Sequence, residues 1–289
     1  MIVIIGASGA VGVPTIRHLA RRGVEMRALT SNEGSAERLR SLGVGETVVG
    51  DFRVDHDVGR AVAGADKVFL VTPRFTEDEA EIGMRVVAAA RAAGVAHFVF
   101  SSAFHPQMRT MNHHWTKLLI EEAVIESGLA FTILQPSMFM QNVRVEWTSV
   151  TNDGIYPRPY SATRKMSLVD TEDLGEAAAI VLTEDGYAGA TFELCGPDSL
   201  SHAEMASVFS GVLGRDVRAV ERSLDEWQVW ARGRGWTEWS IETYVKMCGH
   251  YGAHGYPGGN PLVLRTILGR EPTGYRSFAE RFAGEMSGG

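Results

Sequence analysis

The 289-residue sequence has few cysteines, no long hydrophobic run and no excess of positive charge. Its two cysteines, Cys195 and Cys248, cannot build a disulfide framework, which favours a reducing compartment. No apolar run approaches the ~18 residues that span a bilayer, and the N-terminus lacks the basic lead of a signal peptide. The 28 basic and 35 acidic residues give a net charge of −7 and no electrostatic reason for nucleic-acid binding. We therefore expect a cytoplasmic protein without nucleic-acid or membrane partners.

The first half of the chain alternates short apolar strands with amphipathic helices. The strands are apolar nearly throughout, which is typical of strands buried on both faces of a sheet. The glycines that end the intervening helices fit left-handed C-caps; they are Gly23, Gly43, Gly94 and Gly128. The predicted strands are Ile2–Ile5, Glu25–Thr30, Glu46–Gly50, Lys67–Thr72, His97–Ser102 and Ala130–Gln135. This alternation predicts an α/β fold with a doubly wound parallel sheet.

The second half of the chain has a looser pattern. A strand at Thr191–Leu194 is expected to return to the main sheet. Ser201 and Ser223 are each followed three residues later by glutamate, the spacing of a capping box, so helices should begin there. We therefore predict a dinucleotide-binding domain at residues 1–150 and a smaller, mainly helical substrate-binding lobe at residues 151–289.

Tryptophan is concentrated in this second half. Four of the six tryptophans lie within thirteen residues: Trp227, Trp230, Trp236 and Trp239. Such a cluster packs the core of a small helical lobe, or it lines a substrate pocket. Both interpretations stay open, and Trp227 and Trp230 are candidate substrate contacts.

The strongest local motif is the turn after the first strand. Residues 6–12 read Gly-Ala-Ser-Gly-Ala-Val-Gly and lead into an amphipathic helix at Val11–Arg22. In this Rossmann-type arrangement, Gly6 permits the tight turn, Gly9 lets the backbone approach a diphosphate, and Gly12 allows close helix packing. The helix N-terminus adds amide donors for the phosphates. The other residues of the turn expected to contact the dinucleotide are Ser8, Ala10 and Val11.

The end of the second strand bears on which dinucleotide binds. No carboxylate stands at the strand tip to accept a hydrogen bond from the ribose 2′-hydroxyl of NAD. Ser31 and Asn32 could instead donate to the 2′-phosphate of NADP, and Arg38 follows one helical turn later. Glu33 could serve NAD if its loop turned inward. The pattern favours NADP, with NAD as the alternative.

Polar side chains follow several other strands, and in an open parallel sheet ligands bind outside the carboxyl ends of the strands. The third strand is followed by Asp51, a candidate partner of the adenine amine, and Phe52, which could stack on the base. The remaining candidate cofactor contacts are Thr72, Pro73, Ser101, Ser102, Gln135 and Pro136. Ser137, Met138 and Phe139 come next in the chain and are candidate substrate contacts.

Several segments together resemble the NmrA-like branch of the atypical short-chain dehydrogenases/reductases. They are residues 6–12, 50–52, 65–73, 131–142, 167–174 and 268–273, which cover nearly the whole chain. The resemblance implies a reductase that uses NAD(P)H, since the family includes quinone reductases and triphenylmethane dye reductases. It also includes regulators that bind the dinucleotide without turnover.

The sequence departs from the Tyr-x-x-x-Lys pair that typical short-chain dehydrogenases use. None of its four lysines has a tyrosine four residues earlier; the nearest counterpart is His113 with Lys117. Residues at this spacing share one face of a helix. The resemblance implies that Lys117 contacts the nicotinamide ribose, and the ordinary pKa of histidine suits His113 to donate a proton.

We therefore predict an NAD(P)H-dependent oxidoreductase that reduces a small conjugated acceptor, such as a quinone, an enone or a related carbonyl. The acceptor is expected between the exit of the sixth strand and the tryptophan-bearing lobe. The alternative is a dinucleotide-sensing regulator without catalysis. A homodimer is possible. His250 and His254 have a zinc-ligand spacing, but the glycines around them argue against a firm helix and therefore against a metal site.

Overall fold

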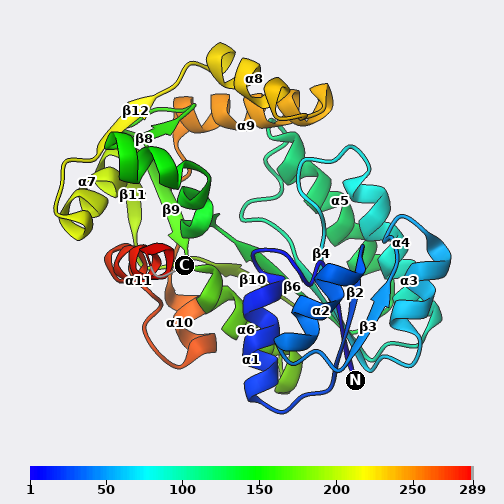
Figure 1. The fold of residues 1–289 in the computed structure, drawn as a ribbon. Coiled ribbons are helices and arrows are strands. Elements are labelled where there is room, and N and C mark those ends of the chain that lie inside the picture. Colours follow the sequence, from blue (N-terminus) through cyan, green and yellow to red (C-terminus); the bar gives the residue numbers. More distant parts are fainter. Residues whose placement is uncertain (288–289) are drawn as a thin grey trace. The chain divides into compact units, whose positions relative to one another are not determined.

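The computed structural model describes residues 1–287 and divides the chain into two compact units (Figure 1). Both units draw on separate stretches of the sequence. Unit 1 consists of Met1–Met108, His114–Pro136 and Thr171–Glu193, and unit 2 consists of Arg109–His113, Ser137–Asp170 and the described residues from Leu194 onward. Apart from the short stretch Arg109–His113, the chain leaves unit 1 after the sixth strand and returns to it for one helix and one strand.

Unit 1 contains a seven-stranded sheet with the strand order β10-β6-β5-β4-β1-β2-β3. Neighbouring strands from β6 to β3 run parallel. The strands are β1 (Ile2–Ile5), β2 (Met26–Thr30), β3 (Glu46–Val49), β4 (Lys67–Val71), β5 (His97–Ser101), β6 (Phe131–Pro136) and β10 (Ala190–Leu194). The order changes direction between β1 and β4, which is the switch point where open α/β sheets bind ligands.

Helices cover both faces of this sheet. They are α1 (Gly12–Arg21), α2 (Glu33–Ser41), α3 (Asp55–Val62), α4 (Glu79–Ala92), α5 (Asn112–Glu126) and α6 (Thr171–Thr183). On one face, α3, α4 and α5 bury residues such as Val58, Val86 and Ile120 against the strands. Helices α1 and α6 contribute nothing to that core; they pack on each other, and α6 contacts β5 and β6. The predicted doubly wound α/β fold is confirmed.

The strand positions follow from burial. The sequence of β5 is apolar except at its ends, and all of its residues are buried. The six strands predicted from the first half of the chain are all present, with ends shifted by at most one residue. The glycines predicted as left-handed C-caps all have positive φ angles, from 67° at Gly23 to 103° at Gly43.

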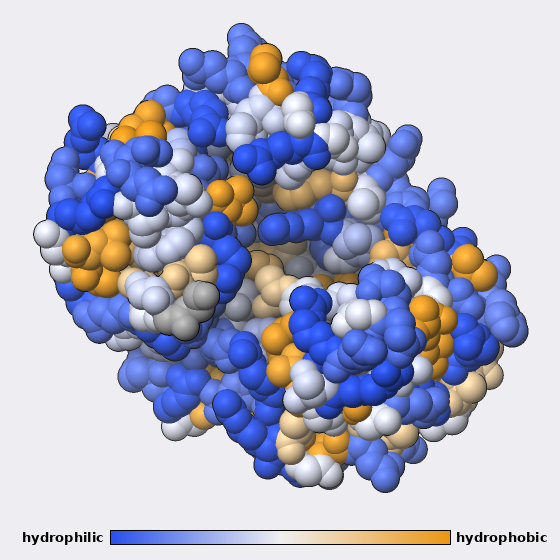
Figure 2. Space-filling view, in the orientation of Figure 1, coloured by the Kyte–Doolittle hydropathy of each residue, from blue (hydrophilic) through white to orange (hydrophobic). Residues whose placement is uncertain are grey.

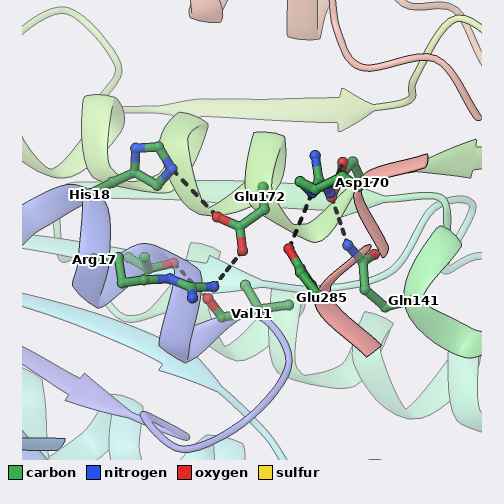
Figure 3. A network of polar contacts seen from close by, with 9 residues as sticks. Val11, Arg17, His18, Gln141, Asp170, Glu172 and Glu285 are labelled. Atoms are coloured by element: carbon green, nitrogen blue, oxygen red, sulfur yellow. Dashed lines mark hydrogen bonds and ion pairs between the residues drawn. The ribbon is translucent and has the colours of Figure 1, made fainter. Parts of the chain in front are cut away.

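Close packing of α1 on α6 depends on a glycine. A Cβ at Gly175 would lie 2.5 Å from Cβ of Pro14 and 2.7 Å from the Thr15 amide nitrogen, so the two helices approach to backbone distance. The guanidinium of Arg17 on α1 also pairs with the carboxylate of Glu172 on α6, and His18 lies 3.9 Å from the same carboxylate (Figure 3). These contacts hold the helix that follows the glycine-rich turn.

Unit 2 combines two small sheets with several helices. A three-stranded sheet has the order β11-β9-β7, and β12 pairs with β8. The strands are β7 (Met138–Phe139), β8 (Ile155–Arg158), β9 (Lys165–Val169), β11 (Ser199–Ser201) and β12 (Arg218–Glu221). The helices are the 3₁₀ helix η1 (Met140–Glu146), the π-helix η2 (Ser149–Asp153), α7 (His202–Leu213), α8 (Leu224–Gly233), α9 (Glu238–His254), α10 (Leu262–Leu268) and α11 (Tyr275–Ser287).

Local sequence signals explain the starts of α7 and α8. The hydroxyl of Ser201 accepts a hydrogen bond from the Glu204 amide, and the Glu204 carboxylate accepts one from the Ser201 amide. Ser223 and Glu226 form the same reciprocal pair. Each pair satisfies two backbone donors that a helix start otherwise leaves free. The two predicted capping boxes are present.

A buried carboxylate anchors the C-terminal helix of unit 2. Asp170, which is completely buried, accepts a hydrogen bond of 2.6 Å from Gln141 (Figure 3). It also accepts one of 2.6 Å from Arg281 on α11. The carboxylate of Asp198 accepts a hydrogen bond of 2.6 Å from the Tyr275 amide at the start of the same helix. Both acids are therefore occupied in holding α11.

The surface is mainly hydrophilic on the face shown in Figure 2, with apolar residues in small separate groups. The most exposed large apolar side chains on the described residues are Val229, Val145, Leu262 and Ile125. No helix within residues 1–287 is long and apolar enough to cross a membrane.

Candidate active site at the carboxyl ends of the strands

The glycine-rich turn joins β1 to α1 with almost no free space. Gly6 has a φ of +83°, and a Cβ there would lie 2.2 Å from the carbonyl oxygen of Val71. A Cβ at Gly12 would lie 2.4 Å from the Gly6 oxygen and 2.6 Å from the Ala7 oxygen. Gly9 is different, because its Cβ would meet only the Gly6 oxygen, at 3.3 Å. Gly6 and Gly12 are therefore required by the fold, whereas Gly9 leaves backbone open to solvent.

The open side of this turn carries backbone donors. The amides of Ala10 and Val11 come directly before the first turn of α1 and donate no hydrogen bond to any residue that the structure describes. Ser8, Gly9 and Ala10 are exposed. Free amides at a helix N-terminus bind anions. The turn therefore fits the diphosphate of a dinucleotide.

The tip of β2 is polar and lacks an unpaired acid. The Asn32 side chain accepts a hydrogen bond of 2.9 Å from the Ser35 amide and so caps α2, and it donates one of 3.1 Å to the Ser31 hydroxyl. Glu33 forms an ion pair of 2.7 Å with Arg40. Arg38 is exposed on α2. This arrangement offers hydroxyl and amide groups rather than a free carboxylate to a ribose.

The loop after β3 is held by acidic side chains. The Asp57 carboxylate accepts a hydrogen bond of 2.9 Å from the Asp51 amide, and that of Asp51 accepts one of 2.8 Å from the Arg53 amide. The Arg53 guanidinium pairs with Asp78 at 2.5 Å and lies 4.9 Å from the centre of the Phe52 ring. The adenine contacts expected of Asp51 and Phe52 stay predictions.

A buried ion pair lies where β4 ends. Lys117 on α5 places its Nζ 2.9 Å from Oε1 of Glu79 and donates a hydrogen bond of 2.5 Å to Oγ1 of Thr72. The Thr72 hydroxyl in turn donates to Glu79 at 2.8 Å. Glu79 is fully buried and Lys117 is 4% exposed. Lys117 is therefore held in one position beside the strand ends.

A second buried carboxyl group, Glu121, lies one turn further along α5. The side-chain amide nitrogen of Gln135 donates to both of its oxygens, at 2.9 and 3.0 Å. Burial raises the pKa of Glu121, although Ser102, Gln135 and the charge of Lys117 oppose that rise. The structure thus brings Ser102, Lys117 and Gln135 together, three residues singled out in the sequence. Glu121 was not predicted, although its spacing of four from Lys117 signals a shared helix face.

Most of the other predicted residues lie in unit 2 or close to its boundary. Ser137 is buried, and its amide donates to the Leu194 carbonyl oxygen at 3.0 Å. Met138 and Phe139 are half-buried in β7, and His113 is half-buried in the first turn of α5. The contacts of His113, Ser137, Met138 and Phe139 with ligands stay predictions.

The tryptophans of unit 2 form an aromatic cluster. Trp227 is buried, stacks on Tyr244 with ring centres 4.1 Å apart, and meets Trp236 edge to face at 5.3 Å. Trp230 packs at the border of the cluster beneath Arg234, whose guanidinium lies 4.5 Å from its ring centre. Core packing accounts for Trp227, and substrate contact by Trp227 or Trp230 stays a prediction.

The expectation that glycines prevent a helix around His250 is wrong. Helix α9 extends to His254, because the burial of Cys248 and Tyr251 in the same stretch stabilises it. The two imidazole rings lie 4.8 Å apart, and His250 is within 3.4 Å of the Thr110 hydroxyl. No group of three or more potential ligands that could hold a metal ion occurs among the described residues.

Comparisons with known proteins agree with this geometry. The model of the NmrA-like family matches residues 1–252. NAD(P)H azoreductase from Xenophilus azovorans is 32% identical over 82% of both chains. A (4-alkanoyl-5-oxo-2,5-dihydrofuran-3-yl)methyl phosphate reductase from Streptomyces griseus is 34% identical over 78% of both chains. The crystal structure of Citrobacter sp. triphenylmethane reductase complexed with NADP(H) has a TM-score of 0.85 at 23% identity and covers 98% of this chain and 100% of that chain.

These comparisons define the class of the protein as well as its fold. The likeness to the triphenylmethane reductase structure, at 23% identity, shows the fold alone. The family match covers residues 1–252, most of the sequence, and therefore shows the family. The chain belongs to the NmrA-like family. The family predicted from the glycine-rich turn, residues 131–142 and the other matching segments is therefore confirmed.

Proposed function

We propose that this protein is an NAD(P)H-dependent reductase that transfers a hydride to a small conjugated acceptor, such as an azo compound, a quinone or an enone. The glycine-rich turn carries the proposal, because its fold leaves no room for side chains at Gly6 and Gly12 and leaves free amides at a helix N-terminus. The names of the two relatives above 30% identity, both reductases, support the choice of reaction.

The residues have distinct parts in this function. The amides of Ala10 and Val11 bind the diphosphate, and the absence of an unpaired acid at the tip of β2 favours NADPH over NADH. Lys117, held by Glu79 and Thr72, donates to the nicotinamide ribose. The bound cofactor supplies the hydride, and the protein orients the acceptor and supplies a proton where the acceptor needs one.

We further propose a cytoplasmic setting and small-molecule substrates, with neither nucleic acid nor membrane as a partner. Both cysteines are buried, and neither forms a disulfide with any residue from 1 to 287, which suits a reducing compartment. A homodimer also stays a prediction, which sedimentation analysis tests.

The test of the function is an optical assay of NADPH oxidation with a panel of azo dyes, quinones and enones. We expect turnover with at least one class of acceptor and weaker binding of NADH than of NADPH. The Lys117→Ala variant should lose both cofactor affinity and turnover. Tight cofactor binding without oxidation by any acceptor would instead support the non-catalytic regulator.

A further inference from the structure

Glu121 is a buried carboxyl group that neither the packing nor the binding of the cofactor explains. It is 5% exposed and lies between the ends of β5 and β6. Its oxygens accept hydrogen bonds from a neutral amide, that of Gln135. The charge of Lys117 acts on Glu121, but its ammonium group contacts Glu79 and Thr72. Glu121 therefore has no ion-pair partner of its own among residues 1–287, and burial raises its pKa because it disfavours the charged carboxylate.

The Ser102 hydroxyl is the second unusual group in this cluster. It is buried at the carboxyl end of β5 and forms no hydrogen bond of normal geometry with any residue from 1 to 287. It lies near enough to Glu121 to lower the pKa of that carboxyl group. A hydroxyl can accept one proton and donate another. Ser102 is thus placed to link Glu121 to a ligand at the strand ends.

We propose that Glu121 is the proton source for acceptors that need a proton as well as a hydride, with the Ser102 hydroxyl as the relay. This inference rests on the proposed function and assigns the origin of its proton. It replaces His113, which the sequence suggested, because Glu121 and Ser102 lie together inside the strand-end cluster of unit 1.

With an azo acceptor, the step adds one hydride and one proton across the N=N bond. The hydride from NADPH forms a bond to one nitrogen, and the π electrons of the N=N bond move to the other nitrogen. That nitrogen takes the proton of Ser102, whose oxygen takes the proton of Glu121. The products are a hydrazine, the oxidised cofactor and the Glu121 carboxylate, which faces the positive charge of Lys117 until water reprotonates it.

A comparison of two acceptors tests this proposal. An azo dye needs a hydride and a proton, whereas a triphenylmethane dye cation needs a hydride alone because its carbon already carries the positive charge. The variants are Glu121→Gln, which keeps the shape of the side chain but cannot donate an acidic proton, and Ser102→Ala. Glu122→Gln is the matched control, since Glu122 is the exposed neighbour on the same helix.

We expect the ratio of the azo rate to the cation rate to fall about 100-fold in Glu121→Gln and in Ser102→Ala, because a positioned acid contributes about that factor or more. The ratio in Glu122→Gln should equal that of the unmutated protein. If the two variants reduce both dyes more slowly by the same factor, or reduce both at the unmutated rate, the proposal is overturned. The reductase function would stay intact in either case. An unmutated protein that reduces neither dye would overturn the function itself.

Infrared spectroscopy supplies a readout that does not depend on turnover. A protonated buried carboxyl group has a C=O stretching band that persists to higher pH than the bands of exposed acids. We expect this band in the unmutated protein and in Glu122→Gln, and we expect its loss in Glu121→Gln. The rate of azo reduction should fall as the pH rises through the range in which this band disappears. A spectrum without the band would contradict the assignment of Glu121.

Discussion

Replacing the glycines of the β1–α1 turn one at a time separates the glycine that serves the ligand from the one that serves the fold. In Gly12→Ala the new methyl group meets two backbone oxygens, at 2.4 and 2.6 Å, and neither can move cheaply. We expect a loss of about 1–3 kcal/mol in the free energy of unfolding, the usual cost of overpacking. In Gly9→Ala the methyl group meets one oxygen at 3.3 Å, so stability should change by less than about 1 kcal/mol.

Cofactor binding should respond in the opposite way. The methyl group of Gly9→Ala stands where the diphosphate must approach the backbone, and we expect the dissociation constant of NADPH to rise at least ~10-fold, or about 1.4 kcal/mol. Gly249→Ala is the control, because Gly249 lies inside α9 with no atom within 4 Å of its Cβ position. It should gain up to about 1 kcal/mol of stability and bind NADPH normally.

The assays are denaturant unfolding for stability and isothermal calorimetry for NADPH binding, applied to all three variants. If Gly9→Ala binds NADPH as tightly as the unmutated protein, the backbone of this turn does not hold the diphosphate. If Gly12→Ala is as stable as the unmutated protein, the close approach of the Gly6 and Ala7 oxygens does not require glycine at position 12.

Three further predictions concern charged and titratable groups. Glu79→Gln leaves the buried ammonium group of Lys117 without its carboxylate, so urea unfolding should show a loss of about 3–5 kcal/mol, and a change below about 0.5 kcal/mol would contradict the buried pair. Burial lowers the pKa of His202 to about 3, so the unfolded chain binds a proton that the folded chain does not. Stability should therefore fall as the pH drops from about 6.5 towards 3, and His202→Phe should flatten that part of the curve. The hydrogen bond from Lys165, and then that from the Ser201 amide, lowers the pKa of Glu204 to about 2. The ionised Glu204 therefore stabilises the fold above the unfolded pKa of about 4.3, and this stabilisation disappears as the pH falls towards 2. Because the side chain is half exposed, Glu204→Gln should lower the free energy of unfolding by less than about 1 kcal/mol at neutral pH.

The sequence was sufficient for the sheet of unit 1 because its signals are local. Strands such as His97–Ser101 are short and apolar, and the glycines that end the helices need positive φ angles whatever lies nearby. The capping boxes at Ser201 and Ser223 are local in the same sense, since each is complete within four residues.

The contacts of the site depended on the tertiary structure. Glu79 and Thr72 meet Lys117 only when α4 and α5 lie on the same face of the sheet, and no spacing in the sequence reports that contact. Glu121 could have been suggested by its distance of four residues from Lys117, but its contact with Gln135 joins α5 to β6. The helix around His250 was missed because burial of Cys248 and Tyr251 outweighed the local preference of the glycines.

The most direct measurement of the central claim is a single-turnover reaction of the purified protein, loaded with one equivalent of NADPH and mixed with an azo dye or a quinone. We predict that the reduced nicotinamide and the acceptor disappear together, mole for mole, and that the burst is lost in Lys117→Ala. A complex that forms but keeps its reduced cofactor in the presence of every acceptor would contradict the reductase and leave a protein that only binds the dinucleotide.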